Sequence, residues 1–261
     1  MEPALASIGF YAYVIILCRL SVHLFRHSAR DAQWLYAIVE FFGTLQLCAC
    51  VFENGAFLYF YGWTAFYTIL AVMVVVHTNT LGGAICNPAS VLEDAIRGKM
   101  TWSRAGVLLM AEILGGAISY PFCRQYWRFG LHPMHHDRFA TYACQTDLHV
   151  HVLLGLFLEL GASMLAQIAV LFFTDKFPGR TQTQSICNGC TFAAITCTGL
   201  FTTGMYYNPI LASALTFGCD GLDSMRHLAV YWLGPTVGQY LGTDLYERTH
   251  AKPVDVAKKK E

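Results

Sequence analysis

Apolar residues recur along this chain in runs of about 20, and short polar connectors separate the runs. The runs cover residues 4–25, 34–52, 63–78, 105–123, 152–173, 186–207 and 228–246. An α-helix of about 20 apolar residues matches the thickness of the hydrocarbon core of a bilayer. The pattern therefore predicts an all-α membrane protein with an N-terminal hydrophobic helix followed by six transmembrane helices. The first helix, over 4–25, either spans the bilayer or lies in its interface.

Two shorter apolar stretches, 88–97 and 209–218, each begin at an Asn-Pro pair, within "GGAICNPAS" and "YYNPILAS". At roughly ten residues they are too short to span a bilayer. Asparagine is favoured at the N-cap and proline at the first helical position, so each pair starts a helix. We expect two half-helices that enter the membrane without crossing it. Backbone of this kind is tolerated only where it is buried in protein or lines a water-filled path.

Landmarks in the two halves of the chain repeat at nearly one offset. Glu40 and Glu159 are 119 residues apart, Asn87 and Asn208 are 121 apart, and "ILGG" precedes "WLGP" by 119. Each copy holds three spans, an odd number, so the copies insert with opposite orientation, as in many transport proteins.

The repeat divides the chain into five parts. These are an N-terminal hydrophobic helix and basic linker (1–31), the first repeat (32–130), a lumenal connecting loop (131–151), the second repeat (152–248) and a cytosolic basic tail (249–261).

Inversion brings the N-termini of the half-helices together near the membrane midplane. Each terminus carries about half a positive charge. If the Asn87 and Asn208 oxygens cap their own helices, the amide NH2 groups are left to face a solute. Such a site suits a neutral molecule with an oxygen acceptor and opposes cations. Glu40 and Glu159 are predicted to accept from backbone NH groups of the re-entrant loops, with an interfacial or pore-facing acid as the alternative. Glu112 has no acidic counterpart in the second repeat.

At these residues the sequence resembles the aquaporins, the major intrinsic protein family, and most resembles their unorthodox superaquaporin branch. The resemblance rests on "EFFGT" and on the two boxes, Asn87-Pro88-Ala89 and Asn208-Pro209-Ile210. It implies an aquaporin-like bundle of six transmembrane helices plus two re-entrant half-helices, a homotetramer in membrane lipid, and one pore per subunit. The substrates implied are water and small neutral solutes.

The resemblance also assigns a selectivity filter. Counting from each asparagine places Tyr67, Thr196, Met205 and Leu211 at its positions, and Leu211 replaces the arginine of orthodox water channels. An uncharged filter favours glycerol or hydrogen peroxide beside water. The alternative is a non-conducting scaffold with the same fold, because Ile210 and Leu211 are bulky near the pore. An active transporter is disfavoured by the resemblance.

Charge supports this picture and adds an orientation. Only 13% of residues are charged, against about 25% in soluble proteins, and the 17 basic residues balance 17 acidic ones, so no nucleic-acid partner is expected. All basic residues except Arg124, Arg128, Arg138 and Arg226 fall on one side, which predicts a cytosolic C-terminus.

The final "KKKE" places Lys258 and Lys259 as a dilysine signal for retrieval to the endoplasmic reticulum. The alternatives are an ordinary basic tail and a plasma-membrane location.

The remaining chemistry-bearing residues point to no reaction. Most of the ten cysteines lie in apolar runs and are expected to be buried and free; Cys144 and Cys219 are able to pair only if the fold brings them together. For His132, His135 and His136 we favour a solvated lumenal loop over metal binding or pH sensing. No catalytic triad or phosphate loop is present, so we expect no enzyme activity, cofactor or metal.

Overall fold

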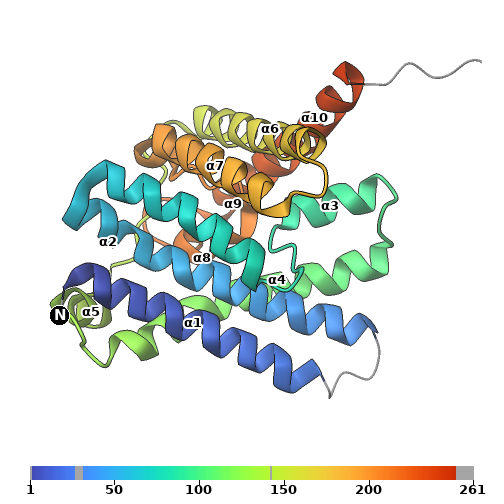
Figure 1. Ribbon diagram of the computed structural model, residues 1–261. Helices are drawn as coiled ribbons and strands as arrows, with labels where there is room; N and C mark the ends of the chain where they lie inside the picture. The colour runs from blue at the N-terminus through green and yellow to red at the C-terminus, as the bar shows by residue number, and fades with distance from the viewer. Residues whose placement is uncertain (1, 27–31, 142, 251–261) are drawn as a thin grey trace, which may run out of the picture.

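The computed structural model describes residues 2–26, 32–141 and 143–250, and these form a bundle of helices (Figure 1). Within this part of the chain there is no β-strand, only an isolated bridge between Gln145 and Asp220. In chain order the helices are α1 (Pro3–Arg26), α2 (Ala32–Thr80), α3 (Pro88–Ile96), α4 (Trp102–Trp127), α5 (Pro133–Thr141), α6 (Val152–Lys176), α7 (Thr181–Thr203), α8 (Pro209–Thr216), α9 (Ser224–Leu228), the π-helix η1 (Ala229–Leu233) and α10 (Gly234–Thr249).

The long helices account for the predicted spans. In the described ranges, α1, α2, α4, α6 and α7 are long and apolar enough to cross a membrane. Helix α2 supplies two arms, because Gly62 has a φ of 78° and reverses the chain between the runs predicted over 34–52 and 63–78. A φ of this sign is readily adopted only by glycine. Figure 1 shows the two arms folded back beside each other.

The last span is not one regular helix. Helices α9, η1 and α10 follow one another without a break from Ser224 to Thr249. Pro235 lies in the first turn of α10 and has no N–H to donate to the preceding turn. The wider π turn of η1, directly before it, accommodates the missing bond.

Helix α1 runs along the length of the bundle rather than across its end. Near its start, the Ser7 hydroxyl donates to Glu53 Oε2 over 3.0 Å. Near its other end, Arg19 donates to the carbonyl of Asn79 over 3.2 Å. Between these points Phe10 is fully buried, in a core cluster shared with α2 and α4. The structure thus contains the extra N-terminal hydrophobic helix, packed antiparallel to the first arm of α2.

Glycines at corresponding positions of the two repeats allow close helix packing. A Cβ atom at Gly115 of α4 would lie 2.6 Å from the Phe41 carbonyl oxygen of α2. A Cβ at Gly234 of α10 would lie 3.0 Å from the Leu156 carbonyl oxygen of α6. Both glycines belong to the repeated "ILGG" and "WLGP" landmarks. The absence of a Cβ atom at these two glycines therefore lets α4 pack closely against α2, and α10 against α6.

The connecting loop over 131–151 differs from expectation, because it contains the helix α5. His135 of this helix is fully buried, and its Nε2 lies 3.1 Å from Glu53 Oε1. The solvated-loop interpretation is therefore wrong for His135, although His136 is exposed beside Asp137. Among the described residues, no cluster of three His, Cys, Asp or Glu side chains is suited to a metal ion.

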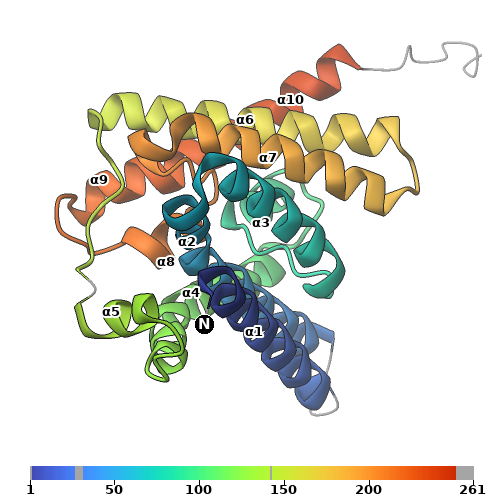
Figure 2. The same cartoon turned by 60° about the vertical axis from the view of Figure 1, so that its left-hand side comes forward.

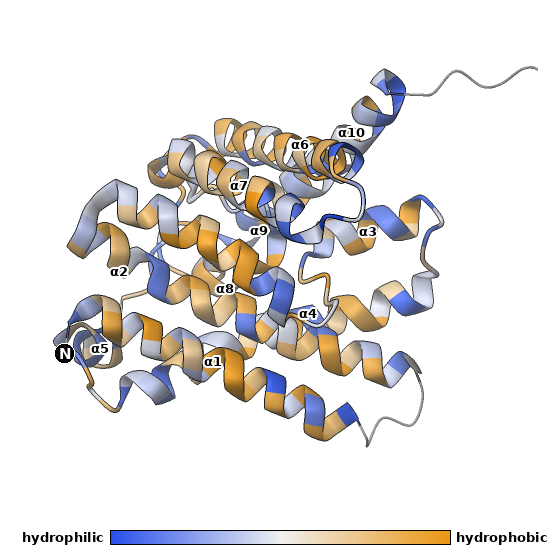
Figure 3. Ribbon diagram, in the orientation of Figure 1, coloured by the Kyte–Doolittle hydropathy of each residue, from blue (hydrophilic) through white to orange (hydrophobic). Residues whose placement is uncertain are grey.

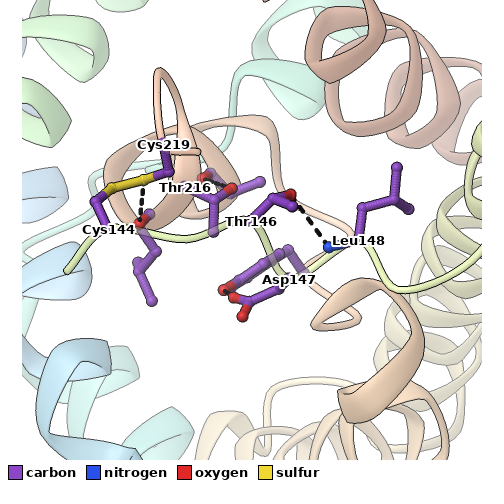
Figure 4. The surroundings of a disulfide bond; sticks show 9 residues. Cys144, Thr146, Asp147, Leu148, Thr216 and Cys219 are labelled. Carbon is purple, nitrogen blue, oxygen red and sulfur yellow. Dashed lines mark hydrogen bonds between the residues drawn. A yellow bond between two sulfur atoms is a disulfide. The ribbon is translucent and has the colours of Figure 1, made fainter. Parts of the chain in front are cut away.

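A disulfide joins Cys144, before α6, to Cys219, after α8 (Figure 4). The Cα atoms of the two residues are 4.9 Å apart. Backbone bonds strengthen the junction, since Thr146 donates to the Asp220 carbonyl and Asp220 donates to the Cys144 carbonyl. The bond closes a loop with a sequence separation of 75, for which about 2–4 kcal/mol of stabilisation is typical. It fastens the C-terminal end of the half-helix α8.

The other eight cysteines are free. Those in the apolar runs behave as small hydrophobic residues: Cys18, Cys48, Cys50, Cys86 and Cys123 are buried, and Cys197 is half-buried.

Candidate functional site

The two half-helices begin in the same way. Asn87 precedes α3, and its side-chain oxygen accepts a bond of 3.0 Å from the backbone NH of Ala89. Asn208 precedes α8, and its side-chain oxygen accepts a bond of 3.1 Å from the backbone NH of Ile210. Pro88 and Pro209 occupy the first helical positions. Each Asn-Pro pair is therefore an N-cap, and the positive end of each short helix points back toward its asparagine.

The residue before each asparagine has an unfavourable backbone conformation. Cys86 has a φ of 54° and Tyr207 a φ of 38°, both in the left-handed region that side chains other than glycine avoid. Such residues cost about 1–3 kcal/mol and persist only where the surroundings hold them.

Glu40 holds the first loop. Its Oε1 accepts a bond of 2.5 Å from the backbone NH of Cys86, and its Oε2 accepts one of 3.0 Å from Ile85. Glu40 is buried, with 3% of the residue exposed. Two charge-assisted bonds to consecutive NH groups thus offset the strain at Cys86.

Glu159 holds the second loop in the same manner. Its Oε2 accepts a bond of 2.6 Å from the backbone NH of Tyr207, and its Oε1 accepts one of 3.1 Å from Tyr206. The Thr203 hydroxyl adds a bond of 2.6 Å to Oε1. The two acids therefore stand in equivalent places, each bound to the two residues before an asparagine.

The loops also contact each other. The Asn208 Nδ2 atom donates over 2.8 Å to the carbonyl of Cys86, the residue before Asn87. One of the two amide hydrogens of Asn208 is thus occupied, which corrects the expectation that the whole NH2 group faces a solute. The bond joins the two re-entrant loops at the level of the two helix N-termini.

Both asparagines line one cavity of about 510 Å³. Apolar side chains from three helices form most of its wall, among them Val74, Ala166, Val170 and Phe192. The asparagines are accompanied by other polar lining residues, His77, Thr78, Ser90, Ser163, Gln167, Tyr207 and Gln239. A mostly apolar channel with isolated donors and acceptors lets a small polar molecule pass without binding it tightly.

The four filter positions do not line this cavity. Thr196 lies beside the second box, since its Oγ1 is 3.2 Å from the Tyr207 hydroxyl. Met205 is buried two residues before Tyr207. Tyr67 instead donates to the Cys190 carbonyl over 3.1 Å, six residues before Thr196 on α7. Leu211 is half-buried in the first turn of α8.

Glu112 belongs to the first of the two loop sites. It is fully buried on α4, next to Glu40 and to the backbone of Asn87. The second repeat has no acid at this place, so the two loop sites are not chemically equivalent.

Several cavity residues were not anticipated from the sequence. His77 lines the cavity, and its Nδ1 lies 3.1 Å from Nε2 of Gln46. Gln239 of α10 also lines the cavity, and it donates to Ser90 over 2.8 Å and to Glu93 over 3.0 Å. Their only signal in the sequence is that they are polar residues inside or beside apolar runs.

Comparison with known proteins shows which family the chain belongs to. The model of the family described as major intrinsic protein matches residues 61–246. The chain belongs to the major intrinsic protein family. Members of this family are membrane channels for water or small solutes, and they are not enzymes.

Similar proteins lie in the superaquaporin branch. The chain is 29% identical over 254 residues to Aquaporin-11 of Milnesium tardigradum, covering 97% of this chain and 89% of that one. It is 26% identical over 242 residues to human Aquaporin-11, covering 91% and 87%. The predicted resemblance is thereby confirmed, and the protein is a multi-pass membrane protein.

A solved structure supports the fold. The aquaglyceroporin of Plasmodium falciparum superposes with a TM-score of 0.66 and 17% identity, over 81% of this chain and 94% of that one. The predicted fold class, an aquaporin-like all-α bundle, is confirmed.

Proposed function

We propose that this chain conducts water and small neutral solutes, including glycerol and hydrogen peroxide, along a path between its two Asn-Pro boxes. The observation that carries this proposal is that Asn87 and Asn208, each at the N-terminus of a half-helix, line one cavity. Their amide groups are hydrogen-bond donors, and the helix termini add positive potential. A molecule with an oxygen acceptor is stabilised there, and a cation is repelled.

The scaffold alternative rests on the bulk of Ile210 and Leu211. The Ile210 side chain faces α4 rather than the cavity, because a Cβ at Gly116 would lie 2.7 Å from Ile210 Cδ1. Neither Ile210 nor Leu211 lines the cavity of the asparagines. This placement favours conduction. Osmotic shrinkage of liposomes that contain the purified protein separates the two functions, since a scaffold leaves the rate at that of protein-free liposomes.

Replacing Leu211 with arginine is expected to lower the ratio of glycerol to water permeability. Leu211 does not line the cavity of the asparagines, and its proposed place at a separate filter rests on the family resemblance. At such a filter leucine offers no hydrogen bond to a passing water molecule, whereas glycerol has apolar surface that loses less. An arginine narrows the path and supplies donors and charge. The measurement is stopped-flow light scattering with both solutes in the same liposomes. An unchanged ratio, as low as that of a strict water channel in both forms, would show that Leu211 does not control selectivity.

We also propose that the C-terminus is cytosolic. The disulfide of Cys144 and Cys219 suits an oxidising compartment such as the lumen of the endoplasmic reticulum. The disulfide lies at the end of the bundle where α6 begins. The last turns of α10 lie at the opposite end, beside the last turns of α6, because Tyr246 of α10 donates to Asp175 of α6. This agrees with the side that the basic residues predict.

Retrieval to the endoplasmic reticulum is proposed on the sequence of the tail, since Lys258 and Lys259 lie outside the described residues. Changing both lysines to serine is expected to move the protein toward the plasma membrane, because the retrieval receptor reads the dilysine pair. Surface biotinylation and organelle imaging measure the shift. If the distribution is unchanged while the protein still folds, the tail is only a solvated basic segment.

The assembly proposed is a homotetramer in membrane lipid, with one pore per subunit and with residues 32–130 and 152–248 as the two repeats. Exposed large apolar side chains on α6 and α7 support burial of these faces against lipid or neighbouring subunits, among them Leu153, Phe157, Leu165, Ile186 and Phe201.

A further inference from the structure

A second cavity, of about 470 Å³, lies outside the proposed pore. It is formed between the last turns of α1, the first turns of α2 and the loop that follows α2. Three basic side chains of α1 line it, Arg19, His23 and Arg26, together with the polar groups of Tyr36 and Thr80. The described residues that line it include no aspartate or glutamate. Two of these residues, Arg19 and Arg26, carry a positive charge.

Arg19 is fixed at the edge of this cavity. Its Nη1 donates to the carbonyls of Asn79 and Thr80, over 3.2 and 3.3 Å. Both printed bonds use the same nitrogen, and together they orient the guanidinium at the edge of the cavity. Arg26 is the last residue of α1, and its side chain is exposed. A fixed guanidinium with a second arginine two turns later suits a phosphate, which accepts bonds from several donors at once.

Exposed apolar side chains adjoin the basic residues. On the same turns of α1, Leu20, Leu24 and Phe25 are 52%, 69% and 50% exposed. Figure 3 shows this end of α1 with hydrophilic and hydrophobic residues intermingled. Arginine side chains at the end of a membrane helix lie at the level of lipid headgroups, while the apolar residues contact the acyl chains. The adjoining apolar surface therefore favours a lipid over a free anion.

We propose that this cavity binds the phosphate headgroup of an acidic lipid from the cytosolic leaflet. Arg19 and Arg26 hold the phosphate, and the acyl chains lie along the apolar side chains of α1. In the orientation given above, this end of the bundle faces the cytosol, where anionic lipids concentrate.

The bound headgroup would lie against a wall of the proposed pore. Leu81 and Gly83 line both this cavity and the cavity of the asparagines. Gln46 lines the lipid cavity and is hydrogen-bonded to Thr80 and to His77, which lines the other. The lipid thus contacts the outer side of the loop that leads to Asn87. Figure 2, turned from Figure 1, shows α1 on the outside of the bundle, where lipid has access to it.

Native mass spectrometry of the full chain in detergent tests the site without requiring conduction, so its failure is distinguishable from failure of the proposed channel. The probes are dioctanoyl phosphatidic acid, dioctanoyl phosphatidylcholine and inorganic phosphate. The test variant is Arg19→Gln with Arg26→Gln, and the matched control is Lys176→Gln with Arg180→Gln, which removes two charges elsewhere on the same side. Arg26→Gln alone serves if the double variant does not fold, because that side chain is exposed.

We expect phosphatidic acid to bind more tightly than phosphatidylcholine. The Arg19 and Arg26 double variant should weaken its binding about tenfold, which corresponds to about 1.4 kcal/mol, and the control variant should not. Equal binding to wild type and test variant would overturn the proposal. An equal loss in the control would reduce the effect to general surface charge and would overturn it too. Displacement of the lipid by inorganic phosphate at equal concentration would assign the cavity to a free anion instead.

Discussion

Leucine in place of Glu40 or Glu159 is expected to prevent assembly of the proposed pore. Each substitution leaves two buried backbone NH groups without an acceptor, at about 1–3 kcal/mol each. It also removes the bonds that hold Cys86 or Tyr207 in a left-handed conformation. The expected loss, about 2–6 kcal/mol, is a large part of the stability of an ordinary domain. Thermal melting followed by size-exclusion chromatography measures it, and liposome flux should fall to background.

Two matched variants separate loss of the acceptor from loss of charge. Glutamine keeps one acceptor oxygen, so Glu40→Gln and Glu159→Gln should be milder than the leucine variants. Asp94→Asn changes a partly exposed acid on α3 and should leave melting and flux as in wild type. If both leucine variants assemble and conduct normally, the two acids do not support the loops.

Alanine in place of Gly238 should lower the melting temperature by several degrees. Gly238 lies where α10 crosses α6, and a Cβ atom there would lie 2.9 Å from the Leu160 carbonyl carbon. The Leu160 backbone cannot move aside as a flexible side chain does, so α10 and α6 must move apart. Overpacking of this kind costs about 1–3 kcal/mol. Because Ser90 and Gln239 form part of the cavity wall from α3 and α10, flux should fall as well.

A second glycine, on α6, provides the control for the Gly238 variant. Gly161 follows Leu160 on α6, and a Cβ atom there would have no atom within 4 Å. Gly161→Ala should therefore be neutral, or stabilising by up to about 1 kcal/mol from helix propensity. Equal melting temperatures for the two alanine variants would contradict the close-packing explanation.

Much of the fold was predictable because it depends on local signals. Asparagine is preferred at the N-cap and proline at the first helical position, and both preferences are local, so the start of each half-helix could be located from two residues. The paired acids and the "ILGG" and "WLGP" landmarks predicted an internal repeat because the members of each pair are separated by nearly the same number of residues. The length of the apolar runs predicted where the long helices lie.

Features that depend on contacts between distant segments were not predictable. The polar residues around His135 in the sequence favour an exposed position. In the structure its side chain is buried beside Glu53, a residue 82 positions earlier in the chain. The direction of Ile210 is set by the space beside Gly116, which no local pattern reveals. The pairing of Cys144 with Cys219 needs the segment before α6 to pass the end of α8. Counting residues from an asparagine likewise gives a position but no orientation, as Tyr67 and Leu211 illustrate.

The most direct test of conduction between the Asn-Pro boxes fills the cavity from one wall. Ala166 of α6 lines the cavity of about 510 Å³, while its neighbour Leu165 is 55% exposed on the outer face. We predict that wild type and Leu165→Trp shrink liposomes under an osmotic gradient much faster than protein-free liposomes do, and that Ala166→Trp does not. Size-exclusion profiles establish that each variant is folded. If Ala166→Trp misfolds, Val170→Trp, which also fills the cavity from α6, takes its place. Rapid shrinkage with a folded cavity-filling variant, or wild-type shrinkage no faster than protein-free liposomes, would contradict the account.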